Sequence, residues 1–206
     1  MKNFIYLSGK ENWLHEKYYA AGGNGRYFTW QVALNLLHQR HINPVIVETG
    51  CQRMADDLGA GMSTSIFGEY VTRYGGTCTS VDNNAEHLGR CEVFTRPFNG
   101  VSLVQSDSVA YLKDYDGPGI DLLYLDSLDY PIGDDANNVR MQKEAQDHCL
   151  NEFKAIEDKL GENTIVLIDD NDFDTGGKPA KLKDYLLSKE WILLLDLQQS
   201  LWVRVV

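Results

Sequence analysis

The sequence lacks the features of a zinc-binding, secreted or membrane-spanning chain. Its 4 cysteines are far apart and form no CxxC pair, which argues against a thiolate zinc site. No apolar run approaches the roughly 18 residues that a membrane helix needs. The first residues, MKNFIYLSGKENW, contain no long apolar segment of the kind found in signal peptides. We therefore expect a cytoplasmic protein whose thiols are reduced.

Positive charge is also scarce. The 206 residues include 19 Lys and Arg against 30 Asp and Glu, so the formal net charge is −11. Such a chain binds phosphate backbones and anionic membranes poorly, because both need clustered basic residues. We therefore expect neither nucleic acid nor a membrane as a partner. The remaining composition, 43% hydrophobic and 24% charged, is typical of one globular domain of this length.

Short apolar runs alternate with helical stretches from residue 44 onward. Runs such as PVIVE contain β-branched residues and are typical of strands buried on both faces. Strands are expected at 44–48, 75–82, 101–107, 119–126, 163–170, 191–197 and 200–206. Helices are expected at 63–74, 84–94, 108–114, 178–188 and 138–160, the last of these ended by Gly161.

The order of these elements predicts an α/β protein with a Rossmann-like, doubly wound, mostly parallel sheet of seven strands. Only Gln198 and Gln199 separate the last two strands, which is too short for a crossover helix. These strands must therefore form a C-terminal antiparallel hairpin. Residues 44–206 form one domain in this prediction. Residues 1–43 form an N-terminal helical extension or lid, with helices at 12–20 and 29–40, the second capped by Thr29, and a break at 21–26.

Acidic residues stand at the end of each expected parallel strand. In a parallel sheet these ends lie on one edge, and that edge is where open α/β sheets bind ligands. A single such Asp is most often a helix cap, but five strand ends in register favour a shared site. An edge this acidic suits ribose hydroxyls, amines, a sulfonium group or a divalent cation. The residues are Glu48, Asp82, Asp107, Asp126, Asp169 and Asp170.

Two glycine motifs of nucleotide-binding proteins are missing. The loop that follows Glu48 has glycines at Gly50, Gly59 and Gly61, where the backbone can approach a ligand closely. It contains no GxGxxG fingerprint directly after the strand, which weakens a nicotinamide-dinucleotide interpretation. The pattern GxxxxGK[ST] of phosphate-binding loops is absent as well.

The order of elements, the E-x-G turn at Glu48-Thr49-Gly50 and the acid Asp82 at the end of the second strand resemble class I S-adenosylmethionine-dependent methyltransferases. The terminal hairpin is typical of that family, and the resemblance covers about residues 44–206. It implies that Gly50 passes along the methionine and ribose parts of the cofactor, with Glu48 near the methionine end. Asp82 would bind both ribose hydroxyls.

The same resemblance implies that Asp107, together with Ser108, meets the adenine amine. The segment 51–58 is longer than in the family's compact G-x-G-x-G motif, so the loop departs from the pattern. Two further cofactor-binding candidates are Ser63, at the end of this loop, and Asp126, at the end of the fourth strand. The alternative is that Ser63 or Thr64 caps the helix that follows.

A second signal comes from LLYLDSLDY and VLIDDND, which place Asp126, Asp169 and Asp170 at the ends of the fourth and fifth strands. If these strands are neighbours, three carboxylates converge and repel one another unless they are protonated or bridged by a cation. Oxygen ligands suit Mg²⁺ or Ca²⁺. The pattern resembles divalent-metal-dependent O-methyltransferases of the catechol and macrolide-sugar types. In those enzymes the metal binds the acceptor hydroxyl and lowers its pKa.

Two residues are candidates for proton transfer, beside a catalytic role for Asp126. Macrolide-sugar enzymes carry D-G-D-L-Y after the fourth strand, with the second Asp as general base. This sequence reads D-S-L-D-Y, which makes Asp129 the candidate base with one residue more between the acids. His148, in the long helix, is the second candidate, and a structural role is the usual one for a helical histidine.

Two further features remain open between structure and function. Gly176-Gly177-Lys178 is either a flexible flap or the entry to a helix, and the helix entry is favoured. The aromatic residues of the N-terminal region either pack a helix on the sheet or form a lid over the ligands. These residues are Trp13, Tyr18, Tyr19, Tyr27, Phe28 and Trp30.

The sequence therefore predicts an S-adenosylmethionine-dependent methyltransferase that transfers a methyl group to a small-molecule hydroxyl with the help of Mg²⁺ or another divalent cation. The family resemblance leaves a homodimer open. Three alternatives remain, because a fold does not determine a reaction. They are other chemistry on the same scaffold, such as hydroxylation or glycan or natural-product biosynthesis; a non-catalytic cofactor- or metal-binding protein; and, least favoured, a nicotinamide oxidoreductase.

Overall fold

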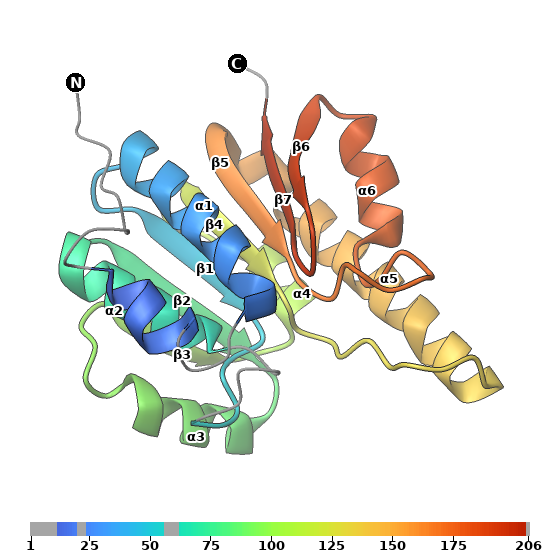
Figure 1. Ribbon diagram of the computed structural model, residues 1–206, viewed down its shortest axis with the longest axis horizontal. Coiled ribbons are helices and arrows are strands. Elements are labelled where there is room, and N and C mark those ends of the chain that lie inside the picture. Colours follow the sequence, from blue (N-terminus) through green and yellow to red (C-terminus); the bar gives the residue numbers. More distant parts are fainter. Residues whose placement is uncertain (1–11, 20–23, 56–61, 205–206) are drawn as a thin grey trace.

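A computed structural model of the protein describes residues 12–19, 24–55 and 62–204 (Figure 1). One sheet of seven strands runs through it, in the order β3-β2-β1-β4-β5-β7-β6. The strands are β1 (Val45–Thr49), β2 (Thr77–Asp82), β3 (Val101–Gln105), β4 (Ile120–Leu125), β5 (Leu160–Ile168), β6 (Trp191–Asp196) and β7 (Ser200–Arg204).

Helices alternate with the first strands along the chain and cover both faces of the sheet (Figure 1). A π-helical turn, η1, precedes them, and a short 3-10 turn, η2, follows the longest helix. They are η1 (His15–Tyr19), α1 (Asn24–Arg40), α2 (Ser63–Tyr74), α3 (Ala85–Thr95), α4 (Ser108–Lys113), α5 (Ala136–Ile156), η2 (Glu157–Lys159) and α6 (Ala180–Leu187). No helix in the described ranges is long and apolar enough to cross a membrane.

The central strands are apolar throughout because each of them faces two hydrophobic cores. In β4, Leu122 and Tyr124 point into the core beneath α1 and α2. Leu123 and Leu125, the alternating residues, point into the core beneath α4, α5 and α6. This period of two explains how a continuous run such as IDLLYLD stays buried without a polar face.

The predicted topology is confirmed. β1 pairs with β2 and β4, β2 with β3, and β4 with β5, all of them in parallel. β7 is antiparallel to both of its neighbours, β5 and β6, and Trp202 of β7 pairs with Val166 on one side and Leu193 on the other. The sheet is therefore mostly parallel, with the expected C-terminal hairpin at one end.

Two predicted helix boundaries are wrong, and both have a tertiary cause. α1 begins at Asn24, inside the expected break, and Thr29 does not cap it but donates from its hydroxyl to the Arg26 carbonyl at 2.9 Å. Gly161 does not end a helix, because α5 stops at Ile156 and β5 begins at Leu160 to pair with β4. Gly59, Gly61 and residues 20–23 and 205–206 lie outside the described residues.

The N-terminal aromatic residues divide between core and surface. Trp13, Tyr18 and Trp30 are buried, as expected of helices that pack on the sheet. Tyr19 and Phe28 remain 41% and 49% exposed, so a lid over a ligand stays a prediction for them.

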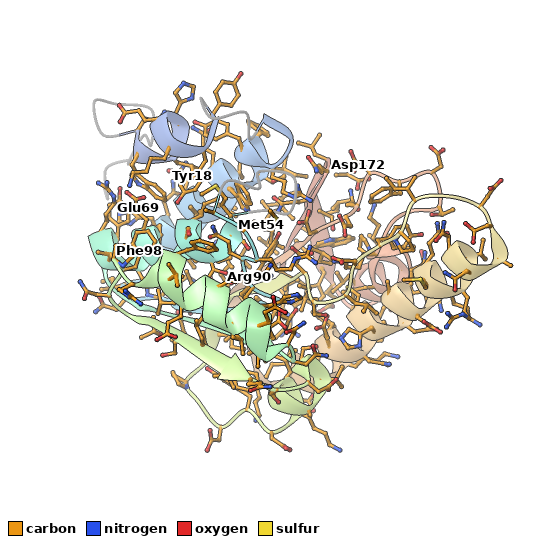
Figure 2. All side chains as sticks on the ribbon, turned by 90° about the horizontal axis from the view of Figure 1, so that it is seen from below. Tyr18, Met54, Glu69, Arg90, Phe98 and Asp172 are labelled. Atoms are coloured by element: carbon orange, nitrogen blue, oxygen red, sulfur yellow. The ribbon has the colours of Figure 1, made fainter. Side chains whose placement is uncertain are left out.

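The turn η1 is tied to α2 by an ion pair. Lys17 Nζ donates to Glu69 Oε2 at 2.8 Å, and Figure 2 shows the labelled Tyr18 and Glu69 on this side of the molecule. The same carboxylate pairs with Arg73 one helical turn later. The N-terminal segment is therefore a packed part of the domain over the residues that are described.

A substitution in α5 tests the core beneath the long helix. Phe153 is fully buried, and its ring lies 5.6 Å from that of Trp191 between centroids. We expect Phe153→Ala to lower the free energy of unfolding by about 3–5 kcal/mol, because it removes a large apolar group and leaves a cavity. Urea denaturation measures the change. Val139→Ala, at a position of the same helix that is 52% exposed, should change stability by no more than about 0.5 kcal/mol.

Candidate functional site

A cavity of about 310 Å³ lies at the carboxyl ends of β1, β2 and β4. Four of the predicted site residues line it together, namely Gly50, Asp82, Asp126 and Asp129. The rest of its wall comes from the loops after β1, β2 and β4, from α3 and from α5. These other lining residues are Cys51, Arg53, Asn83, Asn84, His87, Ser127, Leu128, Met141 and Glu144.

Gly50 sits where three strand ends meet. Its φ is 83°, and a Cβ atom there would lie 2.4 Å from the carbonyl oxygen of Asp126. Its N–H donates to the Val81 carbonyl at 2.7 Å. Only glycine adopts this conformation and allows this approach at no cost, which explains the E-x-G pattern in the sequence.

Asp82, the last residue of β2, faces the cavity with a fixed orientation. Its Oδ1 accepts the N–H of Asn84 at 2.7 Å. Its Oδ2 lies 3.4 Å from His87 Nδ1 and accepts a hydrogen bond of 3.4 Å from Cys51 Sγ. These contacts fix the carboxylate at the cavity wall, and its binding of the ribose hydroxyls stays a prediction.

Glu48 lies under the cavity and does not line it. Thr64 Oγ1 donates to Glu48 Oε2 at 2.7 Å, and Ser80 Oγ donates to the same oxygen. Burial raises the pKa of Glu48 to about 7, while the hydroxyl groups of Ser63, Ser80 and Thr64 oppose that rise. Neither Ser63 nor Thr64 caps α2, and both hydroxyl groups bond to Glu48 instead. The cofactor contact predicted for Ser63 stays a prediction.

Asp107 and Ser108 lie outside the wall of the cavity. Asp107 caps α4 by accepting the N–H of Ala110 at 2.9 Å, the structural role expected of a lone strand-end Asp. The Ser108 hydroxyl is 2.9 Å from Nε2 of His148. The adenine contact predicted for this pair is not tested by the geometry and stays a prediction.

His148 is not among the residues that line the cavity, although Glu144, four residues earlier on α5, is. It lies 3.4 Å from Glu152 through Nε2, the same nitrogen that contacts Ser108. In a serine–histidine–acid relay the acid binds the other ring nitrogen, so this trio is not one. The interaction with Glu152 raises the pKa of His148 above its ordinary value. The arrangement fits a structural role better than that of a catalytic base.

The end of β5 carries a buried ion pair. Arg26 Nε donates to both carboxylate oxygens of Asp169, at 2.8 and 2.9 Å, and the Tyr124 hydroxyl donates to Oδ2 at 2.8 Å. Burial by itself would raise the pKa of Asp169, but Arg26 outweighs it and holds the pKa below its usual range. Asp169 is therefore an ionised carboxylate whose two oxygens are already engaged.

A second buried cation, Lys178, lies between the other two acids. Its Nζ is 2.7 Å from Asp126 Oδ1 and 3.3 Å from Asp170 Oδ2. Burial by itself would lower the pKa of Lys178, but the two carboxylates raise it above its ordinary value, so the ammonium stays charged. Asp126 thus reaches the cavity wall as one half of an ion pair.

These contacts bear directly on the predicted metal centre. Asp126, Asp169 and Asp170 do lie on one edge, as adjacent β4 and β5 require. Their charge is balanced by Arg26 and Lys178, and within the described ranges no three His, Cys, Asp or Glu side chains are grouped to hold a metal ion. The residues present therefore do not fit a resident divalent cation.

Asp129 projects from the loop after β4. Its Oδ2 accepts a hydrogen bond of 2.9 Å from Arg53 Nη1, and its side chain is 75% exposed. Both residues line the cavity, so the ion pair joins the loop after β1 to the loop after β4. Asp129 is the carboxylate of the site with the freest access to solvent.

The sequence prediction missed the three basic residues Arg26, Arg53 and Lys178. Arg26 stood in a segment interpreted as a break, and Arg53 in the long loop after β1. Lys178 did follow a Gly-Gly pair, and a lysine delivered by two glycines to an acidic sheet edge was the signal that could have indicated its place.

The sequence profile of a family described as "Methyltransferase domain" matches residues 57–171, more than half of the chain. The chain belongs to this family. No curated protein matches the sequence. The strand order and the hairpin are those of class I S-adenosylmethionine-dependent methyltransferases.

Solved structures support the fold at low sequence identity. The ribosomal protein L11 methylase of Lactobacillus delbrueckii subsp. bulgaricus is 15% identical, with a TM-score of 0.55 over 88% of this chain and 81% of that one. N-methyltransferase NodS of Bradyrhizobium japonicum, in complex with S-adenosyl-l-homocysteine, is 11% identical, with a TM-score of 0.56 over 97% of this chain and 95% of that one. A Staphylococcus aureus protein assigned as a caffeoyl-CoA O-methyltransferase is 13% identical, with a TM-score of 0.59 over 86% of this chain and 83% of that one.

The buried Glu48 predicts a pH-dependent stability. Its pKa of about 7 exceeds the ordinary 4.5, so the folded state binds this proton more tightly than the unfolded state. Stability should therefore fall as the pH rises through that interval. Between about pH 5.5 and about pH 8 we expect wild type to lose about 2 kcal/mol relative to Glu48→Gln, which cannot ionise.

Urea denaturation at the two pH values measures this difference. Glu86→Gln is the matched control, because Glu86 is exposed near the start of α3. The free energy of unfolding of this variant should change between the two pH values as much as that of wild type. Equal slopes for wild type and Glu48→Gln would contradict a raised pKa at Glu48.

Proposed function

We propose that this protein transfers the methyl group of S-adenosylmethionine to a hydroxyl group of a small molecule. The observation that carries the proposal is that Gly50 and Asp82 line the same cavity as Asp126 and Asp129. In this proposal Gly50 and Asp82 bind the cofactor, and Asp126 and Asp129 lie on the side of the acceptor.

The charge of the cavity supports a sulfonium cofactor. Four acids line it, namely Asp82, Asp126, Asp129 and Glu144, against one arginine and one histidine. A cationic sulfonium is attracted by such a wall, whereas a bare phosphate is repelled. The cofactor of the family thus matches the electrostatics of this chain's own residues.

The acceptor side supports a carboxylate as general base. Asp126 is paired with Lys178, whereas Asp129 is exposed and pairs with Arg53 at 2.9 Å. A hydroxyl placed beside Asp129 could transfer its proton to the carboxylate as its oxygen attacks the methyl group. The net charge of −11 favours a small acceptor over a nucleic acid.

Assistance by Mg²⁺ is the alternative version of this reaction. It would need ligands from carboxylates that already bind Arg26 and Lys178. We expect turnover to be unchanged after dialysis against EDTA. Activity that is lost in EDTA and returns with Mg²⁺ would favour the metal-assisted version.

Cofactor binding is tested at Asp82. Asp82→Ala removes a carboxylate that would accept two ribose hydroxyls, and hydrogen bonds to a charged group contribute about 1.5–3 kcal/mol each. We expect the affinity for S-adenosylmethionine to fall at least about tenfold in isothermal titration calorimetry.

Glu86→Ala serves as the control, because Glu86 follows Asp82 by four residues, in the first turn of α3, and is exposed outside the cavity wall. Failure of the wild type to bind S-adenosylmethionine would refute the proposed function. Binding without turnover over a broad panel of hydroxyl acceptors would favour the non-catalytic alternative, and a product without a transferred methyl group would favour other chemistry.

The base is tested at Asp129. Asp129→Asn keeps the shape of the side chain but cannot accept a proton, so kcat should fall by about 10²–10⁴-fold with little change in cofactor affinity. Mass spectrometry of the methylated product measures turnover. Asp134→Asn, at an exposed acid of the same loop outside the cavity wall, should retain full activity. An unchanged kcat in Asp129→Asn would exclude this residue as the base.

A further inference from the structure

Lys178 is one of the largest fully buried side chains of the protein, with an exposure of 1%. A lysine is almost never buried in this way unless its charge is paired. Here its ammonium touches Asp126 and Asp170, which follow two different strands, at 2.7 and 3.3 Å. It therefore occupies the gap between the ends of β4 and β5.

The backbone that delivers Lys178 is adapted to this purpose. Asp170 has a φ of 49° and Gly177 a φ of 65°, both in the left-handed region. A Cβ atom on Gly177 would lie 2.0 Å from the Asp170 carbonyl oxygen, which accepts the Lys178 N–H at 2.9 Å. The loop thus closes back on Asp170, and only glycine at 177 permits that closure.

The positive charge in this cluster equals that of one divalent cation. Arg26 binds Asp169 at 2.8 Å and lies 3.7 Å from Asp170. Lys178 binds Asp126 and Asp170. Burial raises the pKa of Asp126 and of Asp170, and the Lys178 ammonium opposes both shifts. With all three carboxylates ionised, the cluster of three acids and two single cations carries a formal charge of −1, the same as three carboxylates around one Mg²⁺. The electrostatic need for a metal is therefore met by side chains.

We propose that Arg26 and Lys178 form a built-in replacement for a divalent cation, and that Lys178 positions the Asp126 carboxylate at the cavity wall. The site then works without bound metal, and removal of the Lys178 ammonium opens a place for a divalent cation between Asp126 and Asp170. The inference deepens the proposed function. Only the positioning of Asp126 for catalysis rests on that function, and the replacement of the cation does not.

The chemistry of the ligands supports this exchange. Carboxylate oxygens are the donors that Mg²⁺, Mn²⁺ and Ca²⁺ prefer, and a lysine ammonium competes with those ions for the same lone pairs. Lys178 is tethered to the loop, so it competes at a high effective concentration. Wild type should therefore bind divalent ions weakly although three acids lie together.

The first experiment titrates wild type with Mn²⁺ and follows the loss of the free-ion EPR signal. We expect no specific site, and no rise in melting temperature with Mg²⁺ or Ca²⁺. A Mn²⁺ site in wild type that Asp170→Asn abolishes would overturn the proposal, because a metal would then share the cluster with Lys178.

The second experiment repeats the titration with Lys178→Ala, which removes the charge and leaves space for a hydrated ion. We expect Mn²⁺ to bind at least about tenfold more tightly than to wild type and to raise the melting temperature. The added substitution in Lys178→Ala/Asp170→Asn should abolish that gain. Lys181→Ala removes a lysine of α6 that pairs with Asp147, and it should bind Mn²⁺ no more tightly than wild type does.

Loss of folding does not leave the proposal undecided. If Lys178→Ala unfolds in metal-free buffer and Mn²⁺ restores the folded protein, the proposal is supported. A variant that gains no Mn²⁺ affinity, or that no divalent ion restores, overturns it. Titration of wild type with S-adenosylmethionine is run in parallel, so that failure of the proposed function is recognised by absent cofactor binding and not by these metal results.

Discussion

Three carboxylates at the ends of β4 and β5 can lie together only because two cations are buried among them. Asp126, Asp169 and Asp170 would otherwise repel one another in a region from which water is largely excluded. Arg26 and Lys178 supply the balancing charge, at 2.8 and 2.7 Å from their closest partners. Loss of one partner of such a buried pair typically costs about 3–5 kcal/mol, so the position of each element that brings a charge is constrained.

This charge balance explains how the N-terminal helix belongs to the domain. Arg26 lies in the first turns of α1, and its partner Asp169 is 143 residues away in sequence. The helix therefore has to place its N-terminus over the end of β5, while Trp30 and Leu34 fill the core beneath it. Burial of Trp30 and Leu34 determines which face of α1 contacts the sheet. The ion pair of Arg26 with Asp169 determines how far along β5 the helix lies.

The same long-range contacts explain what could be predicted from sequence. The seven strands follow from local apolar runs, and the acidic edge follows from topology, because parallel strands end together. Gly50 was found through the local E-x-G pattern. Arg26 and Lys178 were not found, because their roles depend on partners that no local pattern names. The predicted metal centre rests on the acids alone for the same reason, since the acids are visible in the sequence and their counter-charges, Arg26 and Lys178, are not.

The acidic edge thus contains two kinds of carboxylate with different chemistry. Asp169 and Asp170 have their charge neutralised by side chains and serve to hold β5, α1 and the Lys178 loop in place. Asp82 and Asp129 instead line the cavity, where a ligand would meet them. Asp126 links the two sets, because one oxygen binds Lys178 while the residue forms part of the cavity wall. The acids beneath the cavity are paired with Arg26 and Lys178, and the acids of its wall give it a negative charge. The cavity can therefore attract a cation without unpaired buried charges that would destabilise the sheet.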